Sequence, residues 1–339
     1  MPANIALFKN LYKGNVNMIN IGIVGYGNLG RGVEKTIKNS PDMKLSGVFT
    51  RREPSSIDCD SPVFHVNDMK NFKGKIDVMI LCGGSKSDIM KQAPETSSML
   101  NTVDSFDTHA KIPEYFDKID TVCKKNSTVS IISTGWDPGL FSINRVMAQA
   151  ILPVGQTYTF WGRGVSQGHS DAVRRINGVK NAVQYTIPNT HMIDEIKSGI
   201  YADYDNKKAH KREVFVVLEE GADPKAVETE IKTMPDYFAG YDTAVHFIDE
   251  ETMQKQHSKV SHGGEVIRLG ETVKGHRSTY SFSLNLSSNP EFTASVNVAY
   301  ARAAYRLAQK NDYGAKTVLD IPIGLLSPYD AEYLRKNMI

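Results

Sequence analysis

The feature that most constrains this chain is a glycine-rich turn between an apolar strand and a helix. The turn, Gly25-Tyr26-Gly27-Asn28-Leu29-Gly30, directly follows the apolar run 19–25, and the pattern after it predicts a helix over 28–39 and a second strand over 44–50. In a G-x-G-x-x-G turn of this setting, the first glycine permits the tight turn, the second admits a pyrophosphate, and the third allows close packing. The turn therefore predicts a dinucleotide site, with N–H donors from the helix N-terminus.

The end of the second strand indicates which dinucleotide binds. A carboxylate about 20 residues after the glycine turn is typical of NAD sites, because it accepts hydrogen bonds from the ribose 2′-hydroxyl. This chain has Thr50, Arg51 and Arg52 there instead. Guanidinium groups suit a 2′-phosphate, so NADP is favoured over NAD. The alternative is that both arginines are solvated loop charges.

A further segment that contacts the cofactor is predicted at the end of the strand 76–82. Cys82, Gly83, Gly84 and Ser85 end this strand, and the glycines permit close contact with a ligand. Cys82 itself is more typical of a small core residue than of a nucleophile.

The remaining pattern predicts two kinds of sheet. Up to Trp136, apolar runs alternate with helical segments, which indicates a Rossmann-type parallel sheet of about five strands or more. The further strands expected in it are 101–106 and 128–134, with helices from Ser87 and near 113–124. After Trp136 the strands become longer and alternate in polarity, which indicates an α+β domain with a mostly antiparallel sheet. These strands are expected at 156–161, 182–187, 213–218, 243–248 and 278–286.

The chain length of 339 residues also indicates two domains, since single cores stop growing near about 250–300 residues. We expect an NADP-binding domain formed by 18–136 with 290–339, because a final helix from Thr293 to Gln309 should return to it. A second, substrate-binding domain is expected over 137–289. Residues 1–17 have a weak pattern and are expected to be an N-terminal extension.

Composition excludes several other classes. The net charge of +2, from 40 basic and 38 acidic residues, gives no overall field that would attract nucleic acid or an anionic membrane. Three cysteines without a C-x-x-C pair argue against a disulfide framework or a bound metal. The apolar runs are strand-sized and no signal peptide is recognisable, so a cytoplasmic location is expected.

Two acidic residues follow strands of the predicted parallel sheet. Asp107 comes just beyond the strand 101–106, and Asp137 follows the strand 128–134 beside Trp136. Ligands bind outside the carboxyl ends of such strands, and two acids with an aromatic side chain suit a cationic amino group. A single acid at such a position is otherwise a common helix N-cap. In the second domain, the basic run 207–212 is typical of a solvated face, although one of its cations pointing inward would suit a carboxylate.

Several long stretches resemble the meso-diaminopimelate D-dehydrogenase family from Ile19 to about Pro328. The resemblance rests on VGYGNLGR (24–31), STGWDPGLFSINRV (133–146), SQGHSDAVRRI (166–176), AVQYT (182–186), TMPDYF (233–238) and SHGG (261–264). The resemblance implies NADP-dependent, reversible oxidative deamination of the D-centre of meso-2,6-diaminopimelate to L-2-amino-6-oxopimelate and ammonia, in lysine and diaminopimelate biosynthesis. It also suggests a homodimer formed through the second domain.

The resemblance further implies which residues form the site. Asp107 and Asp137 would hold the D-centre amino group, and Trp136 and Trp161 would wall its pocket. The distant L-centre would be bound by Thr186, Arg212, His262 and Asn289, with the backbone around Gln167 and Gly168 orienting the substrate. The cofactor contacts expected from the motifs and the resemblance together are Gly25, Tyr26, Gly27, Asn28, Leu29, Thr50, Arg51, Arg52, Cys82, Gly83, Gly84, Ser85, Ser105 and Phe106.

Other functions remain open from the sequence. Gly164-Val165-Ser166-Gln167-Gly168 fits the G-x-S-x-G pattern of serine hydrolases, but a nucleophile elbow needs a buried parallel strand before it and a helix directly after. A non-catalytic NADP-binding sensor is a second alternative, and an NADP-dependent dehydrogenase of another amino acid or an aldehyde is a third.

Overall fold

The computed structural model describes residues 18–258 and 261–339, and the predicted extension 1–17 lies outside them. The chain divides into two compact units. The first runs to Ile143 and resumes at Pro290–Ile339, and the second is Asn144–Asn289. The first break therefore falls between residues 143 and 144 rather than between 136 and 137, within helix α5 (Leu140–Ile151).

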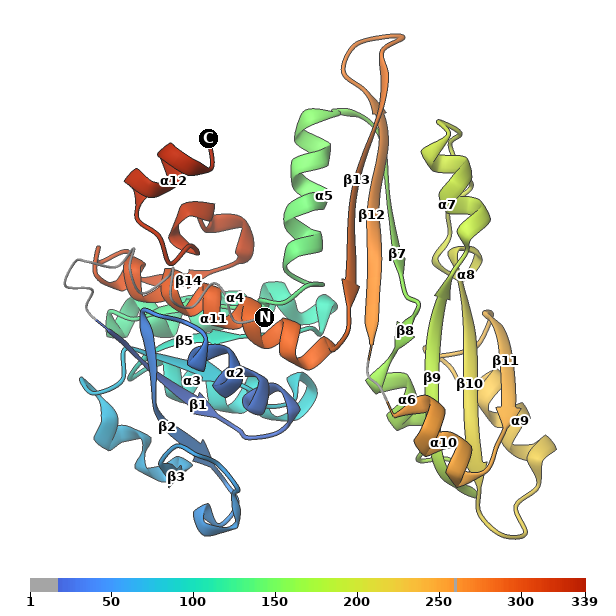
Figure 1. The fold of residues 1–339 in the computed structure, drawn as a ribbon, viewed down its shortest axis with the longest axis horizontal. Coiled ribbons are helices and arrows are strands. Elements are labelled where there is room, and N and C mark those ends of the chain that lie inside the picture. The colour runs from blue at the N-terminus through green and yellow to red at the C-terminus, as the bar shows by residue number, and fades with distance from the viewer. Residues whose placement is uncertain (1–17, 259–260) are drawn as a thin grey trace. The chain divides into compact units, whose positions relative to one another are not determined.

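The first unit contains one seven-stranded sheet in the order β14-β6-β5-β4-β1-β2-β3. Every pair in it is parallel, which confirms the predicted Rossmann-type sheet (Figure 1). The strands are β1 (Ile19–Val24), β2 (Met43–Thr50), β3 (Val63–His65), β4 (Val78–Leu81), β5 (Asn101–Asp104), β6 (Val129–Ile131) and β14 (Gly314–Lys316). The order reverses between β1 and β4, and such a switch point opens a crevice at the carboxyl ends of the strands.

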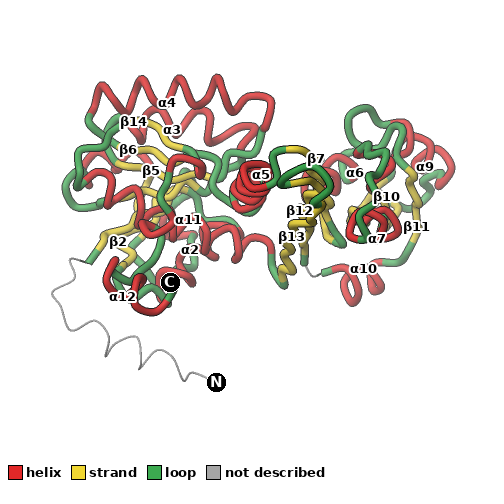
Figure 2. The backbone as a smooth tube through the Cα atoms, turned by 90° about the horizontal axis from the view of Figure 1, so that it is seen from above, coloured by secondary structure: helices red, strands yellow, loops and turns green. Residues whose placement is uncertain are grey.

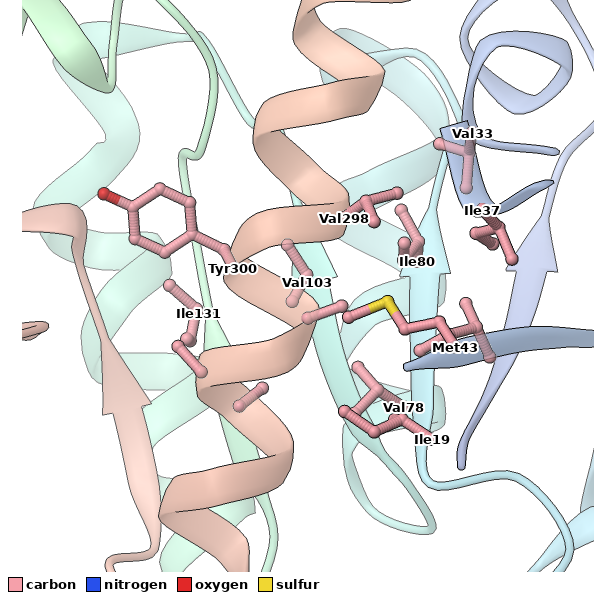
Figure 3. Packing of buried hydrophobic residues seen from close by; sticks show 14 of the residues in the cluster. Ile19, Val33, Ile37, Met43, Val78, Ile80, Val103, Ile131, Val298 and Tyr300 are labelled. Atoms are coloured by element: carbon pink, nitrogen blue, oxygen red, sulfur yellow. The ribbon is translucent and has the colours of Figure 1, made fainter. Parts of the chain in front are cut away.

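Helices cover both faces of this sheet (Figure 2). On one face, α2 (Asn28–Lys38) and α11 (Asn289–Ala308) pack on β1, β4, β5 and β6, where Val298 and Tyr300 contact the strand residues (Figure 3). On the other face, α3 (Met90–Ser97) and α4 (Ile112–Asn126) pack on β4, β5, β6 and β14. The unit ends with α12 (Ala331–Asn337), and its short helical turns are η1 (Pro54–Ser56), η2 (Val66–Phe72), η3 (Ser85–Ile89), η4 (His109–Lys111), η5 (Val318–Asp320) and η6 (Ile323–Leu325).

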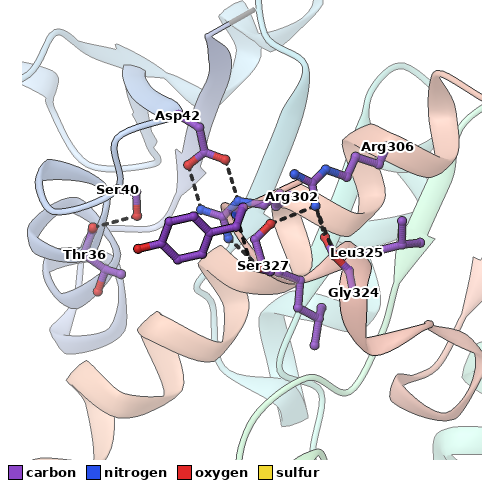
Figure 4. Close-up of polar contacts among 10 residues, drawn as sticks. Thr36, Ser40, Asp42, Arg302, Arg306, Gly324, Leu325 and Ser327 are labelled. Atoms are coloured by element: carbon purple, nitrogen blue, oxygen red, sulfur yellow. Dashed lines mark hydrogen bonds and ion pairs between the residues drawn. The ribbon is translucent and has the colours of Figure 1, made fainter. Parts of the chain in front are cut away.

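A buried ion pair holds α11 in place. Arg302 donates from Nε and Nη2 to the two carboxylate oxygens of Asp42, at 2.5 and 2.7 Å (Figure 4). One turn later, Arg306 Nη1 donates to the carbonyls of Gly324, Leu325 and Ser327. A bidentate pair of this kind fixes both side chains. The ion pair therefore ties α11 to the start of β2, and the Arg306 bonds tie it to the C-terminal segment.

The second unit contains two sheets where the sequence indicated one. One is antiparallel, in the order β13-β12-β7, and the other has the order β11-β10-β9-β8 with only β10 and β11 parallel. The strands are β7 (Val154–Trp161), β8 (Gly164–Val165), β9 (Val179–Pro188), β10 (His210–Leu218), β11 (Asp242–Phe247), β12 (His262–Glu271) and β13 (Arg277–Leu286). The helices are α6 (Gln167–Val173), α7 (Thr190–Lys197), α8 (Asn206–Ala209), α9 (Pro224–Thr233) and α10 (Glu250–His257). The mostly antiparallel α+β prediction is thereby confirmed.

Candidate active site

A cavity of about 300 Å³ lies at the carboxyl ends of β1, β2 and β4. Nine of the predicted cofactor residues line it, namely Gly25, Tyr26, Gly27, Thr50, Arg51, Arg52, Cys82, Gly83 and Gly84. Phe49, Val66, Asp88 and Gln92 complete the lining and were not predicted. The cavity lining does not include Asn28, Leu29, Ser85, Ser105 or Phe106.

The glycine turn has the geometry that a pyrophosphate requires. Gly25 has φ +91°, a conformation that disfavours any side chain. A Cβ on Gly30 would lie 2.3 Å from the Gly25 carbonyl oxygen, so only glycine allows the helix to begin so close to the strand. A Cβ on Gly27 would meet nothing within 4 Å, which leaves open space above the turn. The residues present therefore fit a dinucleotide.

The two arginines after β2 make different contacts in this cavity. Arg52 Nη2 donates to the Tyr26 carbonyl at 2.9 Å, and its backbone N–H donates to Thr50 Oγ1 at 3.1 Å. Arg51 Nη2 forms an ion pair with Asp88 Oδ1 at 2.8 Å. Asp88 also accepts a hydrogen bond from the Gly84 N–H at 3.3 Å. Both arginines thus line the cavity, and both side chains are also exposed to solvent.

Helix α2 fixes Tyr26 and with it the turn. Tyr26 Oη donates to Glu34 Oε2, and Ser61 Oγ donates to Glu34 Oε1 at 3.1 Å. Burial and the bond to Glu34 raise the pKa of Tyr26, so its hydroxyl stays protonated. In the same cavity, burial raises the pKa of the Cys82 thiol, which fits a packing role and not a nucleophile.

The predicted D-centre residues follow adjacent strands of the first unit. Asp107 is exposed after β5, and its N–H donates to Ser85 Oγ at 3.2 Å. Asp137 is half-buried after β6. Trp136 is buried, with its ring edge-on to Phe141 at a centroid distance of 5.2 Å. Phe106 is fully buried against Tyr115, so any cofactor contact at this residue uses its backbone.

Two of the predicted L-centre residues are paired in the second unit. Arg212 on β10 is opposite Thr186 on β9, and its Nη1 donates to Thr186 Oγ1 at 2.5 Å. Its guanidinium lies over the ring of Tyr241 at 4.2 Å. Arg212 is only 9% exposed, and its Nε has no hydrogen-bond partner within the described part of the chain. A buried cation with an unused donor is suited to an anionic ligand.

The other predicted substrate residues lie at the ends of elements. Gln167 and Gly168 form the first turn of α6, and a Cβ on Gly168 would meet nothing within 4 Å. Asn289 begins α11. His262 begins β12, and burial lowers the pKa of its imidazole, so the ring is neutral at pH 7.

Trp161 is held by His210, a residue that sequence reasoning placed only within the basic run 207–212. The backbone N–H of Trp161 donates to His210 Nε2 at 2.9 Å, and His210 Nδ1 donates to the Asn206 carbonyl at 2.9 Å. The two rings lie 5.1 Å apart. Burial lowers the pKa of His210 to about 4, which keeps Nε2 free to accept. Protonation would remove that acceptor.

We expect this histidine to make the protein less stable in acid. Unfolded histidine has a pKa of 6.5, so the unfolded chain binds a proton first as the pH falls. Stability is therefore retained above pH 6.5 and lost between about 6.5 and 4, by roughly 2–3 kcal/mol at pH 4.5. His210→Gln should remove this part of the pH dependence in urea unfolding at pH 7 and 4.5. His191→Gln, at an exposed site on α7, should not, and an equal effect of both variants would contradict the assignment.

The serine hydrolase alternative is excluded by the local geometry. Ser166 follows the two-residue strand β8, which pairs antiparallel with β9. A nucleophile elbow requires a buried parallel strand at that point. Ser166 Oγ instead bonds to His169 Nδ1 at 2.6 Å within the first turn of α6.

The described residues contain neither a metal-binding cluster nor a membrane-spanning helix. In that part of the chain, no group of three or more His, Cys, Asp or Glu side chains is arranged to hold a metal ion. No helix between residues 18 and 339, leaving out 259–260, has the length and apolarity needed to cross a bilayer.

Comparison with known proteins identifies the family. The family described as "Diaminopimelic acid dehydrogenase C-terminal domain" matches residues 135–288. A meso-diaminopimelate D-dehydrogenase from Ureibacillus thermosphaericus is 59% identical over 326 residues, which is 96% of this chain and 100% of that protein. Among solved structures, the Corynebacterium glutamicum diaminopimelate dehydrogenase in complex with diaminopimelate has a TM-score of 0.90 at 46% identity, covering 96% of this chain and 100% of its own. An engineered D-amino acid dehydrogenase bound to NADP+ has a TM-score of 0.85 at 44% identity, covering 95% and 100%.

The parallel sheet and its glycine-lined cavity define a two-domain protein with a dinucleotide-binding unit of the Rossmann class. The relatives narrow this class, since they match nearly the whole length of the chain. The chain belongs to the meso-diaminopimelate D-dehydrogenase family, and the resemblance seen in the sequence is confirmed.

Proposed function

We propose that this chain catalyses the reversible, NADP-dependent oxidative deamination of the D-centre of meso-2,6-diaminopimelate, giving L-2-amino-6-oxopimelate and ammonia. The single observation that carries the proposal is the full-length similarity to meso-diaminopimelate D-dehydrogenases, one of which was solved with diaminopimelate. The engineered relative bound to NADP+ supports the choice of cofactor.

The cavity of the first unit supplies the cofactor contacts. The glycine turn and the start of α2 would hold the pyrophosphate with backbone N–H groups, and Arg51 and Arg52 would bind the 2′-phosphate. NADP+ bound there would supply the acceptor for the hydride that leaves the D-configured Cα. The contact with Asp88 uses Nη2 of Arg51, and the other N–H donors of its guanidinium would be available to the phosphate.

The residues at the exits of β5 and β6 would prepare the D-centre for reaction. Asp107 and Asp137 would bind the ammonium group, and Trp136 would exclude water beside it. Loss of hydride requires the nitrogen lone pair, so the ammonium must first lose a proton to a carboxylate or to water. Water then hydrolyses the resulting imine of the substrate.

The second unit would anchor the other end of the substrate. The Nε donor of Arg212 would bind the L-centre carboxylate, with Thr186, His262 and Asn289 around it and Trp161 beside the pocket. Binding energy from a remote group can orient the reacting carbon. The meso isomer would therefore be preferred, because it places an L-centre at this anchor while its D-centre reacts.

Tyr241 gives a test of this anchor. Removing the ring that lies under a desolvated guanidinium costs up to about 2 kcal/mol, so Tyr241→Leu should raise KM for meso-diaminopimelate by about 10- to 30-fold with little change in kcat. Tyr241→Phe keeps the ring and should change KM far less. In an Arg212→Met background, Tyr241→Leu should add nothing. An additive effect there would show that Tyr241 acts independently of Arg212.

The decisive assay follows NADPH absorbance with meso-, LL- and DD-diaminopimelate in turn. The meso isomer should support turnover with NADP+, the LL isomer should support none because it lacks a D-centre, and the DD isomer should react poorly because its remote centre has the wrong configuration. Equal rates with the meso and LL isomers would refute the proposal. Cofactor binding without turnover of any isomer would favour the sensor alternative.

The family also supports three broader inferences. We infer that the reaction belongs to diaminopimelate and lysine biosynthesis, that the enzyme works in the cytoplasm, and that it is a homodimer formed through the second unit, Asn144–Asn289. Light scattering of the purified protein tests the last of these, and a monomer mass would contradict it.

A further inference from the structure

We propose that Asp104 is a positioning residue that sets the geometry of both loops carrying the D-centre aspartates. Asp104 ends β5 and is fully buried, three residues before Asp107. Its carboxylate accepts hydrogen bonds from both loops at once. This proposal rests on the proposed function for the roles of Asp107 and Asp137, while the contacts of Asp104 stand independently of it.

One oxygen of Asp104 joins the two strand exits. Oδ1 accepts from the Phe106 N–H at 3.0 Å, in the loop after β5, and from the Ser133 N–H at 3.1 Å, in the loop after β6. The Asp104 carbonyl also accepts from the Thr134 N–H at 2.8 Å and from Thr134 Oγ1 at 3.0 Å. The backbone hydrogen bonds between two adjacent parallel strands hold them together only as far as the strands extend. Beyond that point, Asp104 supplies the connection between the two loops.

The loop after β6 needs such a connection. Ser133 has φ +56°, a left-handed conformation that is uncommon for a residue with a side chain. Strained backbone of this kind persists only where the surroundings determine it. The bond from the Ser133 N–H to Asp104 is placed where it opposes relaxation, four residues before Asp137.

The other oxygen fixes the carboxylate itself. Oδ2 accepts from Tyr115 Oη on α4 at 2.6 Å. Burial raises the pKa of Asp104, while the three hydrogen bonds it accepts lower it. The two backbone donors need an acceptor at Oδ1, and a neutral side chain of the same shape provides one. Asparagine at position 104 should therefore preserve the geometry of both loops, whereas an apolar side chain of similar size should not.

The test compares Asp104→Asn, Asp104→Leu and a matched control. Thr102→Val is the control, since Thr102 lies on the same strand and its hydroxyl donates to Ser130 Oγ at 2.7 Å, away from the loops. Asp104→Leu should lower kcat with meso-diaminopimelate, measured at saturating NADP+, by about 100-fold, the scale expected for misplaced reacting groups. Asp104→Asn should stay close to the unsubstituted enzyme. Thr102→Val should lower the melting temperature without a comparable loss of kcat.

Three kinetic results would overturn the proposal. They are an unchanged kcat in Asp104→Leu, a loss no larger than in a Thr102→Val protein of equal melting temperature, or an Asp104→Asn variant as impaired as Asp104→Leu. A readout independent of activity separates this proposal from the proposed function. In a Trp161→Phe background Trp136 is the only tryptophan, so its emission reports the loop after β6 directly. Asp104→Leu should shift that emission and Asp104→Asn should not, even if the unsubstituted chain turned over no diaminopimelate; an unshifted spectrum in Asp104→Leu would also overturn the proposal.

Discussion

Replacing Asp107 and Asp137 together by asparagine is expected to lower kcat/KM for meso-diaminopimelate by roughly 10²- to 10⁴-fold. Each carboxylate would accept one hydrogen bond from the substrate ammonium, and such charged bonds contribute about 1.5–3 kcal/mol each. The loss should appear in kcat as well as KM, because the same groups orient the D-centre for hydride transfer. Steady-state kinetics with saturating NADP+ measures it.

Two controls define that result. The Kd for NADPH should not change, since neither aspartate lines the cavity at the glycine turn. Asp117→Asn removes an exposed carboxylate on α4 in the same unit and should leave kcat/KM as it was. A double variant with nearly unchanged kcat/KM would mean that these aspartates cap their loops and do not bind substrate.

Changing Arg51 to aspartate and Arg52 to alanine is expected to reduce the preference for NADP+ over NAD+ by roughly 10²- to 10⁴-fold, again from two charged hydrogen bonds of about 1.5–3 kcal/mol. The new carboxylate would repel a 2′-phosphate and would suit a ribose hydroxyl. Asp88, which pairs with Arg51, would then add a second unpaired negative charge at the same wall. The ratio of kcat/KM for the two cofactors is the measurement.

Arg52 also donates to the Tyr26 carbonyl, so some loss of affinity for both cofactors is expected. The ratio corrects for this shared loss, because the turn contacts the part common to NAD+ and NADP+. Arg335→Ala, on α12, removes the same charge elsewhere and should leave the ratio unchanged. If the doubly substituted enzyme kept the KM for NADP+ of the parent, the two arginines would be solvent-exposed loop charges.

The sequence was sufficient to predict those features of the fold and site that depend on residues close together in the chain. Gly25 and Gly30 occupy positions where the backbone admits no side chain, so their spacing predicted the turn directly. Arg51 and Arg52 were predicted because the end of the second strand faces the ribose in any such sheet. The continuous apolar strands likewise predicted the parallel sheet, which the structure confirms.

Contacts between distant segments could not be read from sequence. Tyr241 lies under Arg212, and Asp88 meets Arg51, only because of tertiary packing. An alternating pattern gives the face of a strand but not its partner, so the second unit was expected to have one sheet and has two. Asp104 was read as part of a strand, since nothing in its neighbours showed that Ser133 would donate to it.

The proposed mechanism requires one position for the D-amino nitrogen of the bound substrate. A crystal structure of this protein with NADP(H) and meso-diaminopimelate measures that position. We expect the carboxylates of Asp107 and Asp137 both to lie within hydrogen-bond distance of the D-amino nitrogen. The D-configured Cα should face the nicotinamide, and the L-centre carboxylate should bind Arg212. A complex with the D-amino nitrogen remote from both aspartates, or with the L-centre at the nicotinamide, would contradict this mechanism.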